Sequence, residues 1–281
     1  MDSKKAIVIT GASSGIGKAC ALHLDSLGFK VYAGVRKESD GESLKEQASS
    51  SLVPIILDVT DSDSITAASE IFERETDGSL YGLINNAGIG RGGVLEVTPV
   101  SEMRKLFEVN VIGLMAVTKV FIPMLRKAKG RIINVGSTAS FLAFPGACVY
   151  SGSKFAVRAI TDSLRVELKP YGISVILVAP GAVESEIWDK GQEYKEKLRE
   201  TVKPELKELY APFIRFGDKL NEEVKKIPAL EVAKDVTKAL TAKKPKLVYL
   251  VGHDAKGAAI AARFPKSMLD WMILKHIQKM A

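Results

Sequence analysis

The sequence has few of the side chains that build disulfide frameworks, metal clusters or histidine-based catalytic sites. Its 281 residues include two cysteines, Cys20 and Cys148, and three scattered histidines, His23, His253 and His276. Two cysteines so far apart do not suggest a disulfide framework, and a reducing cytosolic setting is the simplest expectation. With so little thiol and imidazole, we expect neither a metal site nor a catalytic triad based on histidine.

Long apolar runs and clustered positive charge are also lacking. The first apolar run, Ala6–Thr10, is too short for a signal-peptide core, and no later uninterrupted run approaches the ~18 residues of a membrane span. The net charge of +7 is spread along the chain and forms no basic stripe typical of nucleic-acid binding. We therefore expect a cytoplasmic enzyme with no transmembrane segment and no nucleic-acid partner.

What the sequence does contain is a regular alternation of short apolar runs with longer segments of helical periodicity. The β-branched runs are Ala6–Thr10, Lys30–Gly34, Val53–Leu57, Gly82–Asn85, Arg131–Val135, Ser174–Val178 and Leu247–Val251. The helical segments between them include Ile16–Leu27, Ser62–Glu75, Glu102–Arg126 and Tyr150–Lys169. This pattern predicts an α/β fold: a doubly wound, Rossmann-like, seven-stranded parallel sheet with helices on both faces. We expect a single domain over residues 1–281, with ligands at the carboxyl ends of the strands.

Two segments break this alternation. Residues 183–228 are rich in charge of both signs, and we predict a helical insertion that serves as a lid over the substrate; a merely solvated insertion is the alternative. Residues 263–281 form a C-terminal extension that is both apolar and basic around Met268–Ile277. Packing against the core or a subunit interface is the favoured reading of this extension, and peripheral contact with a membrane is the alternative.

A glycine-rich turn follows the first predicted strand. The residues we assign to cofactor binding here are Gly11, Ser13, Ser14, Gly15, Ile16 and Gly17. Glycines permit a tight turn and let backbone N–H groups approach a pyrophosphate at the start of a helix. The strand–turn–helix context therefore predicts a dinucleotide site.

The end of the second strand indicates which nucleotide is bound. Binders of NAD typically place an acidic residue there for the ribose 2′-hydroxyl, whereas an arginine suits a 2′-phosphate. Here Val35 stands about where the acid is expected, and Arg36 and Lys37 follow it. We expect NADP(H) to be favoured over NAD(H), with both cations on the phosphate; two solvated cations at a strand end are the alternative.

Further polar residues close the third and fourth strands. Asp58 and Val59 follow strand three, where a carboxylate can accept from the adenine amino group. Asn86, Ala87 and Gly88 follow strand four and suit a polar turn beside the cofactor. We assign all five to cofactor binding.

The expected catalytic residues are Asn110, Ser137, Tyr150 and Lys154. Tyr150 and Lys154 are spaced i and i+4, which places them on one face of a helix. A nearby ammonium stabilises phenolate and lowers the pKa of a tyrosine toward useful acid–base behaviour. Ser137 follows a strand and can hold the substrate oxygen, while Asn110 is a polar residue in an apolar helical run, where it can perturb the helix.

With these motifs in this order, the sequence resembles the classical short-chain dehydrogenase/reductase family from about Lys5 to Ser185. By that resemblance, Tyr150 is the general acid/base, Lys154 also binds the nicotinamide ribose, and Asn110 supports a proton-relay water. The resemblance further implies that Pro180, Gly181, Val183 and Ser185 border the nicotinamide, with Ser185 replacing the usual threonine. It also implies a homodimer or homotetramer.

Within the family, the sequence is most similar to the hydroxysteroid and retinol dehydrogenase branch. This similarity implies a small apolar alcohol or carbonyl substrate that contacts Ser137, Phe141, Phe144, Cys148 and Tyr150; the apolar residues among these would equally suit the core. An alternative with the same chemistry is reduction of a 3-oxoacyl thioester. A remote alternative is a non-catalytic nucleotide-binding scaffold, which an intact set of Ser137, Tyr150 and Lys154 argues against.

Overall fold

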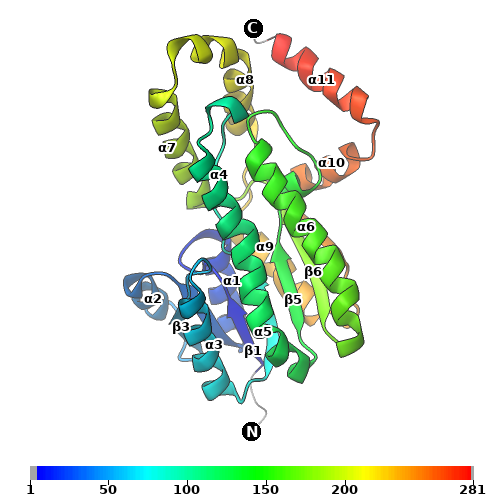
Figure 1. Cartoon of the computed structure of the whole chain (residues 1–281). Coiled ribbons are helices and arrows are strands. Elements are labelled where there is room, and N and C mark those ends of the chain that lie inside the picture. The colour runs from blue at the N-terminus through cyan, green and yellow to red at the C-terminus, as the bar shows by residue number, and fades with distance from the viewer. Residues whose placement is uncertain (1–4, 280–281) are drawn as a thin grey trace.

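A seven-stranded parallel sheet forms the centre of the molecule (Figure 1). The computed structural model describes residues 5–279, and its strands lie in the order β3-β2-β1-β4-β5-β6-β7. They are β1 (Ala6–Ile9), β2 (Lys30–Val35), β3 (Leu52–Ile56), β4 (Leu80–Asn85), β5 (Arg131–Val135), β6 (Ser174–Pro180) and β7 (Val248–Val251). All neighbouring strands pair in parallel, which confirms the predicted doubly wound fold. The ends of the expected domain, residues 1–4 and 280–281, lie outside the described residues.

Helices cover both faces of this sheet. They are α1 (Gly15–Ser26), α2 (Glu38–Lys45), α3 (Ser62–Thr76), α4 (Val100–Phe107), α5 (Leu114–Ala128), α6 (Cys148–Leu168), α7 (Glu186–Thr201), α8 (Pro204–Glu223), α9 (Ala229–Thr241), α10 (His253–Ala261) and α11 (Lys266–Gln278). Short turns of 3₁₀ helix form η1 (Leu95–Val97), η3 (Thr138–Ser140) and η4 (Lys169–Tyr171).

Alternate residues of each strand supply two separate cores. In β1, Ile7 and Ile9 point to the core that α1 and α9 cover, whereas Val8 points to the opposite core. There Phe72 of α3 and Phe121 of α5 meet edge to face, with ring centroids 6.0 Å apart. Because a strand alternates its side chains between faces, a strand covered on both sides must be apolar throughout, as β1 is.

The helical run from Val100 to Ala128 is interrupted by a π-helical segment, η2 (Glu108–Gly113). By length and composition alone this run is apolar enough to cross a membrane. The sequence did not indicate this, because its uninterrupted apolar runs are all short. Its residues Val117, Phe121 and Leu125 are fully buried in the core beside β4, as expected for a core helix of a sheet protein.

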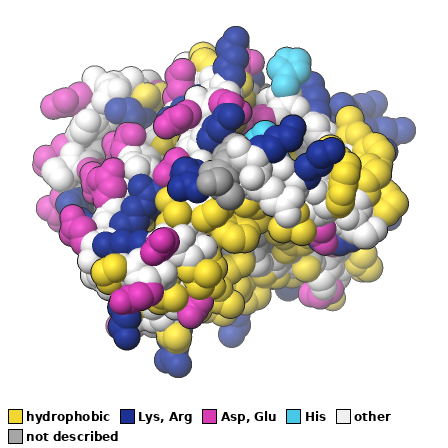
Figure 2. All heavy atoms as spheres, turned by 90° about the horizontal axis from the view of Figure 1, so that it is seen from above, with side chains coloured by type: hydrophobic (Ala, Val, Ile, Leu, Met, Phe, Trp, Pro, Cys, Tyr) yellow, Lys and Arg dark blue, Asp and Glu magenta, His cyan; other side chains and the backbone are white. Residues whose placement is uncertain are grey.

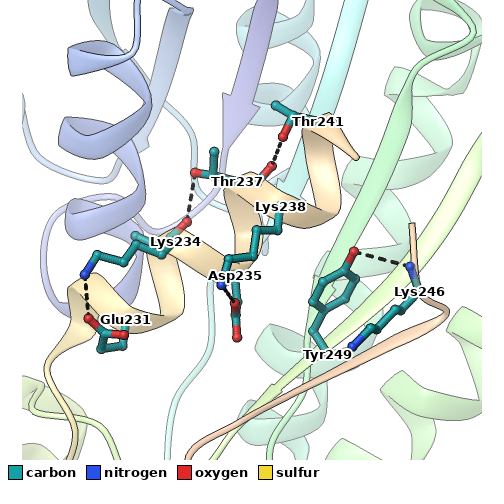
Figure 3. Close-up of polar contacts among 9 residues, drawn as sticks. Glu231, Lys234, Asp235, Thr237, Lys238, Thr241, Lys246 and Tyr249 are labelled. Carbon is teal, nitrogen blue, oxygen red and sulfur yellow. Dashed lines mark hydrogen bonds and ion pairs between the residues drawn. The ribbon is translucent and has the colours of Figure 1, made fainter. Parts of the chain in front are cut away.

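The exposed face of helix α9 carries ion pairs between neighbouring side chains (Figure 3). Lys234 pairs with Glu231 and Lys238 with Asp235, each across 2.7 Å. These ion pairs are solvent-exposed, and such pairs typically contribute only about 0–1 kcal/mol. The opposite face of α9 carries the buried Val232 and Val236, so apolar packing fixes this helix on the sheet.

The two segments that break the alternation lie beyond the carboxyl ends of the strands (Figure 1). The range 183–228 contains α7 and α8, and α8 packs against α11, with the rings of Phe216 and His276 5.8 Å apart. The range 263–281 contains α11, and its last two residues are outside the described part of the chain. Both segments are therefore helical, and neither adds a strand to the seven-stranded sheet.

Candidate active site

A cleft of about 1730 Å³ opens at the carboxyl ends of the strands, beneath α7 and α8. The predicted cofactor residues that line it are Gly11, Ser13, Ser14, Gly15, Ile16, Arg36, Asp58, Val59, Asn86, Ala87, Gly88, Tyr150, Lys154, Pro180, Gly181, Val183 and Ser185. Residues from turns far apart in the sequence are thus brought together because parallel strands end at the same edge.

The glycine turn has the shape of a phosphate cradle. Gly11 and Gly15 have φ angles of +68° and +54°, a left-handed conformation that side chains rarely adopt. A Cβ built on Gly17 would lie 2.1 Å from the carbonyl oxygen of Gly11, so only glycine allows α1 to start this close to β1. Gly17 is therefore a packing residue and does not line the cleft. The hydroxyl-bearing Ser13 and Ser14 border the open side of the turn, which fits a pyrophosphate at the N-terminus of α1.

Of the two cations after β2, only Arg36 lines the cleft, whereas Lys37 lies outside it at the start of α2. Arg36 is exposed and has no ion-pair partner among the described residues, so its guanidinium is available to an anion.

Asp58, after β3, accepts hydrogen bonds from the backbone N–H and the hydroxyl of Thr60 at 2.9 and 2.8 Å.

Two further residues hold the cofactor turns in place. Asn86 donates through Nδ2 to the carbonyl oxygens of Thr10 and Gly11, at 3.1 and 2.9 Å, and so ties the turn after β4 to the glycine turn. Asp254, from α10, accepts a 2.7 Å hydrogen bond from the N–H of Ala182. The sequence carried no local signal for Asp254, because it lies some seventy residues after the segment it supports.

The structure brings Ser137, Tyr150 and Lys154 together at one wall of the cleft. Ser137 follows β5 and caps η3, where its hydroxyl accepts a 3.2 Å hydrogen bond from the N–H of Ala139. Tyr150 lies in the first turn of α6 and Lys154 in the next, with the ammonium 5.9 Å from the centroid of the tyrosine ring. Lys154 is buried and donates a 3.1 Å hydrogen bond to the carbonyl oxygen of Val135.

Burial dominates the protonation of this pair. It raises the pKa of Tyr150, although the hydrogen bond with Ser137 acts in the opposite direction. Burial also lowers the pKa of Lys154, to about 8 from the usual 10.5. The expected lowering of the Tyr150 pKa by Lys154 is not found: the Lys154 ammonium donates to the Val135 carbonyl, and burial raises the pKa of the phenol.

Asn110 perturbs its helix as predicted. It is buried within the π-helical segment η2. Its Oδ1 accepts from the N–H of Ile89 at 2.8 Å, and its Nδ2 donates to the carbonyl of Ile89 at 3.0 Å and to the hydroxyl of Ser153 at 3.2 Å. Asn110 thus joins the turn after β4 to α6 one residue from Lys154, and π-bulges of this kind are frequent at functional sites.

A network of buried side-chain amides connects α6 to the sheet. Asn134 of β5 donates to the hydroxyl of Thr161 on α6 at 2.9 Å and accepts from Asn85 of β4 at the same distance. Asn85 also donates to the hydroxyl of Thr118 on α5. Because buried amides without partners are costly, this network specifies how α5 and α6 sit on the sheet.

Two predicted substrate residues do not reach the cleft. Phe141 packs against the small core cluster around Leu177, with the guanidinium of Arg158 4.5 Å from its ring centroid. Cys148 is exposed at the first position of α6. Neither residue lines the cleft in this structure, whereas Phe144 does.

The substrate half of the cleft contains residues that the sequence reasoning did not single out. They come from the loop after β4 and from α7, and include Arg91, Val94, Trp188, Tyr194, Lys195 and Leu198. The helical pattern of α7 indicated a lid, but no pattern in one sequence tells which of its faces turns inward.

Comparison with known proteins agrees with this geometry. The family model described as short chain dehydrogenase matches residues 5–196. The chain is 36% identical to 17-beta-hydroxysteroid dehydrogenase type 6 of Bos taurus over 99% of this chain and 90% of that protein. It is 34% identical to the NADPH-dependent 3-dehydrocapnine reductase of Ornithobacterium rhinotracheale over 97% of both chains.

Among solved structures, a short-chain dehydrogenase from Streptomyces avermitilis superposes with a TM-score of 0.80 at 26% identity, covering 98% of this chain and 95% of that one. The full-length similarity to hydroxysteroid dehydrogenases also agrees with the branch that the motifs indicated. The chain therefore belongs to the short-chain dehydrogenase/reductase family and is an NAD(P)-dependent oxidoreductase that acts on CH–OH groups.

Proposed function

We propose that the protein interconverts a lipophilic alcohol and its ketone or aldehyde, with NADP(H) as the favoured cofactor. The observation that carries this proposal is that Ser137, Tyr150 and Lys154 line the same cleft as the glycine turn and as helices α7 and α8. Two hydroxyls beside a buried ammonium provide both a hydrogen-bond donor and a proton donor for one substrate oxygen.

The roles of the residues follow from their surroundings. When bound, the nicotinamide nucleotide supplies or accepts the hydride. In the direction of reduction, Tyr150 Oη gives its proton to the substrate oxygen while the hydroxyl of Ser137 holds that oxygen in place. Lys154 Nζ donates one hydrogen bond to the carbonyl oxygen of Val135, and its remaining N–H groups can donate to the tyrosine oxygen or to a ribose hydroxyl. Asn110 keeps α6 and the loop after β4 in register beside them.

Two observations support NADP(H). β2 ends at Val35, where no acidic side chain stands, and the following Arg36 lines the cleft at the position where a 2′-phosphate is recognised in this fold. The similar reductase of Ornithobacterium rhinotracheale is NADPH-dependent by its name. Arginine binds phosphate in a planar, two-pronged geometry, so its presence in place of an acid favours the phosphorylated nucleotide.

The substrate end supports a lipophilic compound. Apolar residues of the lid and of the facing loop line the cleft, among them Val94, Phe144, Trp188, Leu198 and Phe213. Similar relatives are named for hydroxysteroids and estradiol. An apolar cleft of this size accommodates a steroid, a retinoid or a long alkyl chain.

Exposed apolar side chains also indicate where the protein contacts other surfaces. Phe107, Ile112, Met115 and Phe155 are between 37% and 45% exposed along α4, η2, α5 and α6, and we assign them to the contact with a second copy of this chain. On α10 and α11, Ile260, Trp271, Met272 and Leu274 are at least half exposed. Figure 2, which looks down on this end of the molecule, shows hydrophobic groups beside Lys and Arg side chains. An apolar face with basic neighbours suits a membrane surface.

Replacing Tyr150 by phenylalanine tests the catalytic assignment. We expect turnover of a lipophilic ketone with NADPH to fall by about 10²–10⁴-fold, because the proton donor is lost. The dissociation constant for NADPH, from fluorescence titration, should change little. Tyr171→Phe, at a half-exposed tyrosine far from the cleft, is the matched control. Unchanged turnover in Tyr150→Phe would refute the assignment.

Removing the guanidinium of Arg36 tests the cofactor preference. We expect the wild-type protein to bind NADPH more tightly than NADH, and Arg36→Ala to weaken NADPH binding about tenfold or more because a charge-assisted contact is lost. NADH binding should be unaffected. Arg74→Ala, on the exposed face of α3, serves as the control. Tighter binding of NADH by the wild type, or an Arg36→Ala variant with full affinity for NADPH, would contradict the proposal.

Sedimentation velocity tests the contact between copies. We expect the wild type to sediment as a dimer or tetramer, and Phe155→Glu to shift it toward the monomer because a buried charge opposes association. Val166→Glu, on the same helix but 73% exposed, is the control for an added charge. A monomeric wild type at micromolar concentration would exclude this role of α6.

Co-sedimentation with vesicles tests the role of α11. We expect binding to vesicles that contain phosphatidylserine, and a severalfold loss in Trp271→Glu, since that ring is 60% exposed and would be the part that inserts. Tyr171→Glu provides an exposed aromatic position on another surface. Equal recovery of wild type and Trp271→Glu with the vesicles would rule out α11 as the contact.

A further inference from the structure

The segment that follows β6 is attached to the C-terminal part of the chain by two hydrogen bonds. The N–H of Gly181 donates to the carbonyl oxygen of Val251, the last residue of β7, at 2.9 Å. The N–H of Ala182 donates to Oδ2 of Asp254, in the first turn of α10, at 2.7 Å. A hydrogen bond to a carboxylate is stronger than one between neutral groups, so Asp254 provides the stronger of these two attachments.

Two glycines leave room for the Asp254 carboxylate. A Cβ built on Gly181 would overlap Oδ1 of Asp254, and a Cβ built on Gly252 would lie 2.7 Å from the same atom. Gly252 also has a φ angle of +98°, which side chains rarely adopt. Oδ1 itself accepts a 2.9 Å hydrogen bond from the N–H of Ala255. Both carboxylate oxygens are therefore held by backbone N–H groups, and the surrounding chain is shaped to admit them.

On its other side, the same segment is attached to Ile227, which follows α8. Ile227 donates its N–H to the carbonyl oxygen of Ala182 and accepts from the N–H of Glu184, each at 2.9 Å. Val183 and Ile227 thus form a parallel bridge. In such a bridge the residue between the two bonded neighbours turns its own N–H and C=O the opposite way. The backbone N–H and C=O of Val183 therefore face away from Ile227, and Val183 lines the cleft.

This segment runs from the catalytic wall of the cleft to the glycine turn. It starts at the end of β6, which pairs with β5, and Ser137 follows β5. At its other end, a Cβ built on Gly15 would lie 2.9 Å from Cβ of Ser185. A dinucleotide with its pyrophosphate at the glycine turn and its reactive ring beside Tyr150 must therefore lie along residues 181–185.

We propose that Asp254 is a positioning residue for the nicotinamide half of the cofactor. Its carboxylate fixes Ala182, and through it the backbone groups of Val183 in the cleft, so that α10 becomes part of the cofactor site. This rests on the proposed function, since it assumes that a dinucleotide binds in this orientation. Asp254 takes no part in proton transfer. Without the carboxylate one attachment of the segment is lost, and we expect only the nicotinamide half of the cofactor to be bound more weakly.

Isothermal titration calorimetry on the whole protein tests this with two ligands. One is NADPH, and the other is 2′,5′-ADP, which contains the adenosine half of NADPH and lacks the nicotinamide. NADH and 5′-AMP are titrated in parallel, so that the comparison does not depend on which nucleotide the protein prefers. The variants are Asp254→Ala, Asp254→Asn, which keeps an acceptor of the same size, and Lys256→Gly. Lys256 is exposed in α10 and does not line the cleft, so glycine there weakens the helix and leaves the carboxylate in place.

We expect Asp254→Ala to bind NADPH about tenfold more weakly than the wild type and 2′,5′-ADP within about twofold of it. Asp254→Asn should lie between the two, and it carries the same comparison if Asp254→Ala does not fold. In Lys256→Gly the ratio of the two affinities should equal that of the wild type, because the attachment of Ala182 is intact.

Equal weakening of both ligands in the Asp254 variants, or full affinity for both, overturns the proposal. A Lys256→Gly variant that loses NADPH affinity as selectively as Asp254→Ala overturns it as well, since stability of α10 would then account for the effect. Absence of turnover of every lipophilic ketone, together with selective loss of NADPH binding in Asp254→Ala, would instead refute the proposed reaction and leave the role of Asp254 standing.

Discussion

The attachment of α6 to the carboxyl end of β5 is the contact on which the active site depends. Lys154 donates to the carbonyl of Val135, the last residue of β5, and Asn134 donates to Thr161 two turns further along α6. Ser137 continues directly from this strand, and Tyr150 begins this helix. The two hydrogen bonds therefore help to set the distance between the hydroxyls of Ser137 and Tyr150, which we propose contact the same substrate oxygen. Correct positioning of the reacting groups accounts for much of the rate acceleration by enzymes. These buried hydrogen bonds therefore matter for function as much as the hydroxyl groups of Ser137 and Tyr150 do.

The same contact between α6 and β5 buries Tyr150 and Lys154 and so affects their protonation. Spacing of i and i+4 places Tyr150 and Lys154 on one face of α6, but burial decides their protonation. Burial raises the pKa of the phenol and lowers that of the ammonium, so both groups favour their neutral forms more than in water. The protein alone thus holds the proton on Tyr150, which suits proton donation during reduction. For proton uptake during oxidation we expect one of the remaining N–H donors of Lys154 to approach the phenol oxygen.

The sequence was most informative where one local pattern determines the structure. Alternation of Ile7, Val8 and Ile9 requires a strand covered on both faces, and only glycine fits the conformation at Gly11 and Gly15, so the sheet and the glycine turn were predictable. Phe141 and Cys148 lie outside the lining of the cleft, and the sequence could not indicate this because apolar character does not distinguish a cleft from a core. Asp254 and the inward face of α7 depend on contacts between distant segments, for which a single sequence has no periodic signal.

The lid shows why counting charges is a poor guide to recognition. Residues 190–226 are nearly balanced in Lys, Arg, Asp and Glu, which argues against long-range steering of a charged partner. Exposed charges are screened over about 8–10 Å at physiological salt, so a net charge summed over a helix acts only weakly on a ligand inside a cleft. What acts there are the individual charged side chains that line the cleft, and these carry both signs, among them Lys190, Glu193 and Lys207. An apolar pocket by itself discriminates weakly between hydrophobic compounds, whereas a partly desolvated cation discriminates by the cost of leaving it unpaired. Recognition in this cleft therefore depends on which of these side chains a substrate contacts, and the net charge of the segment does not predict it.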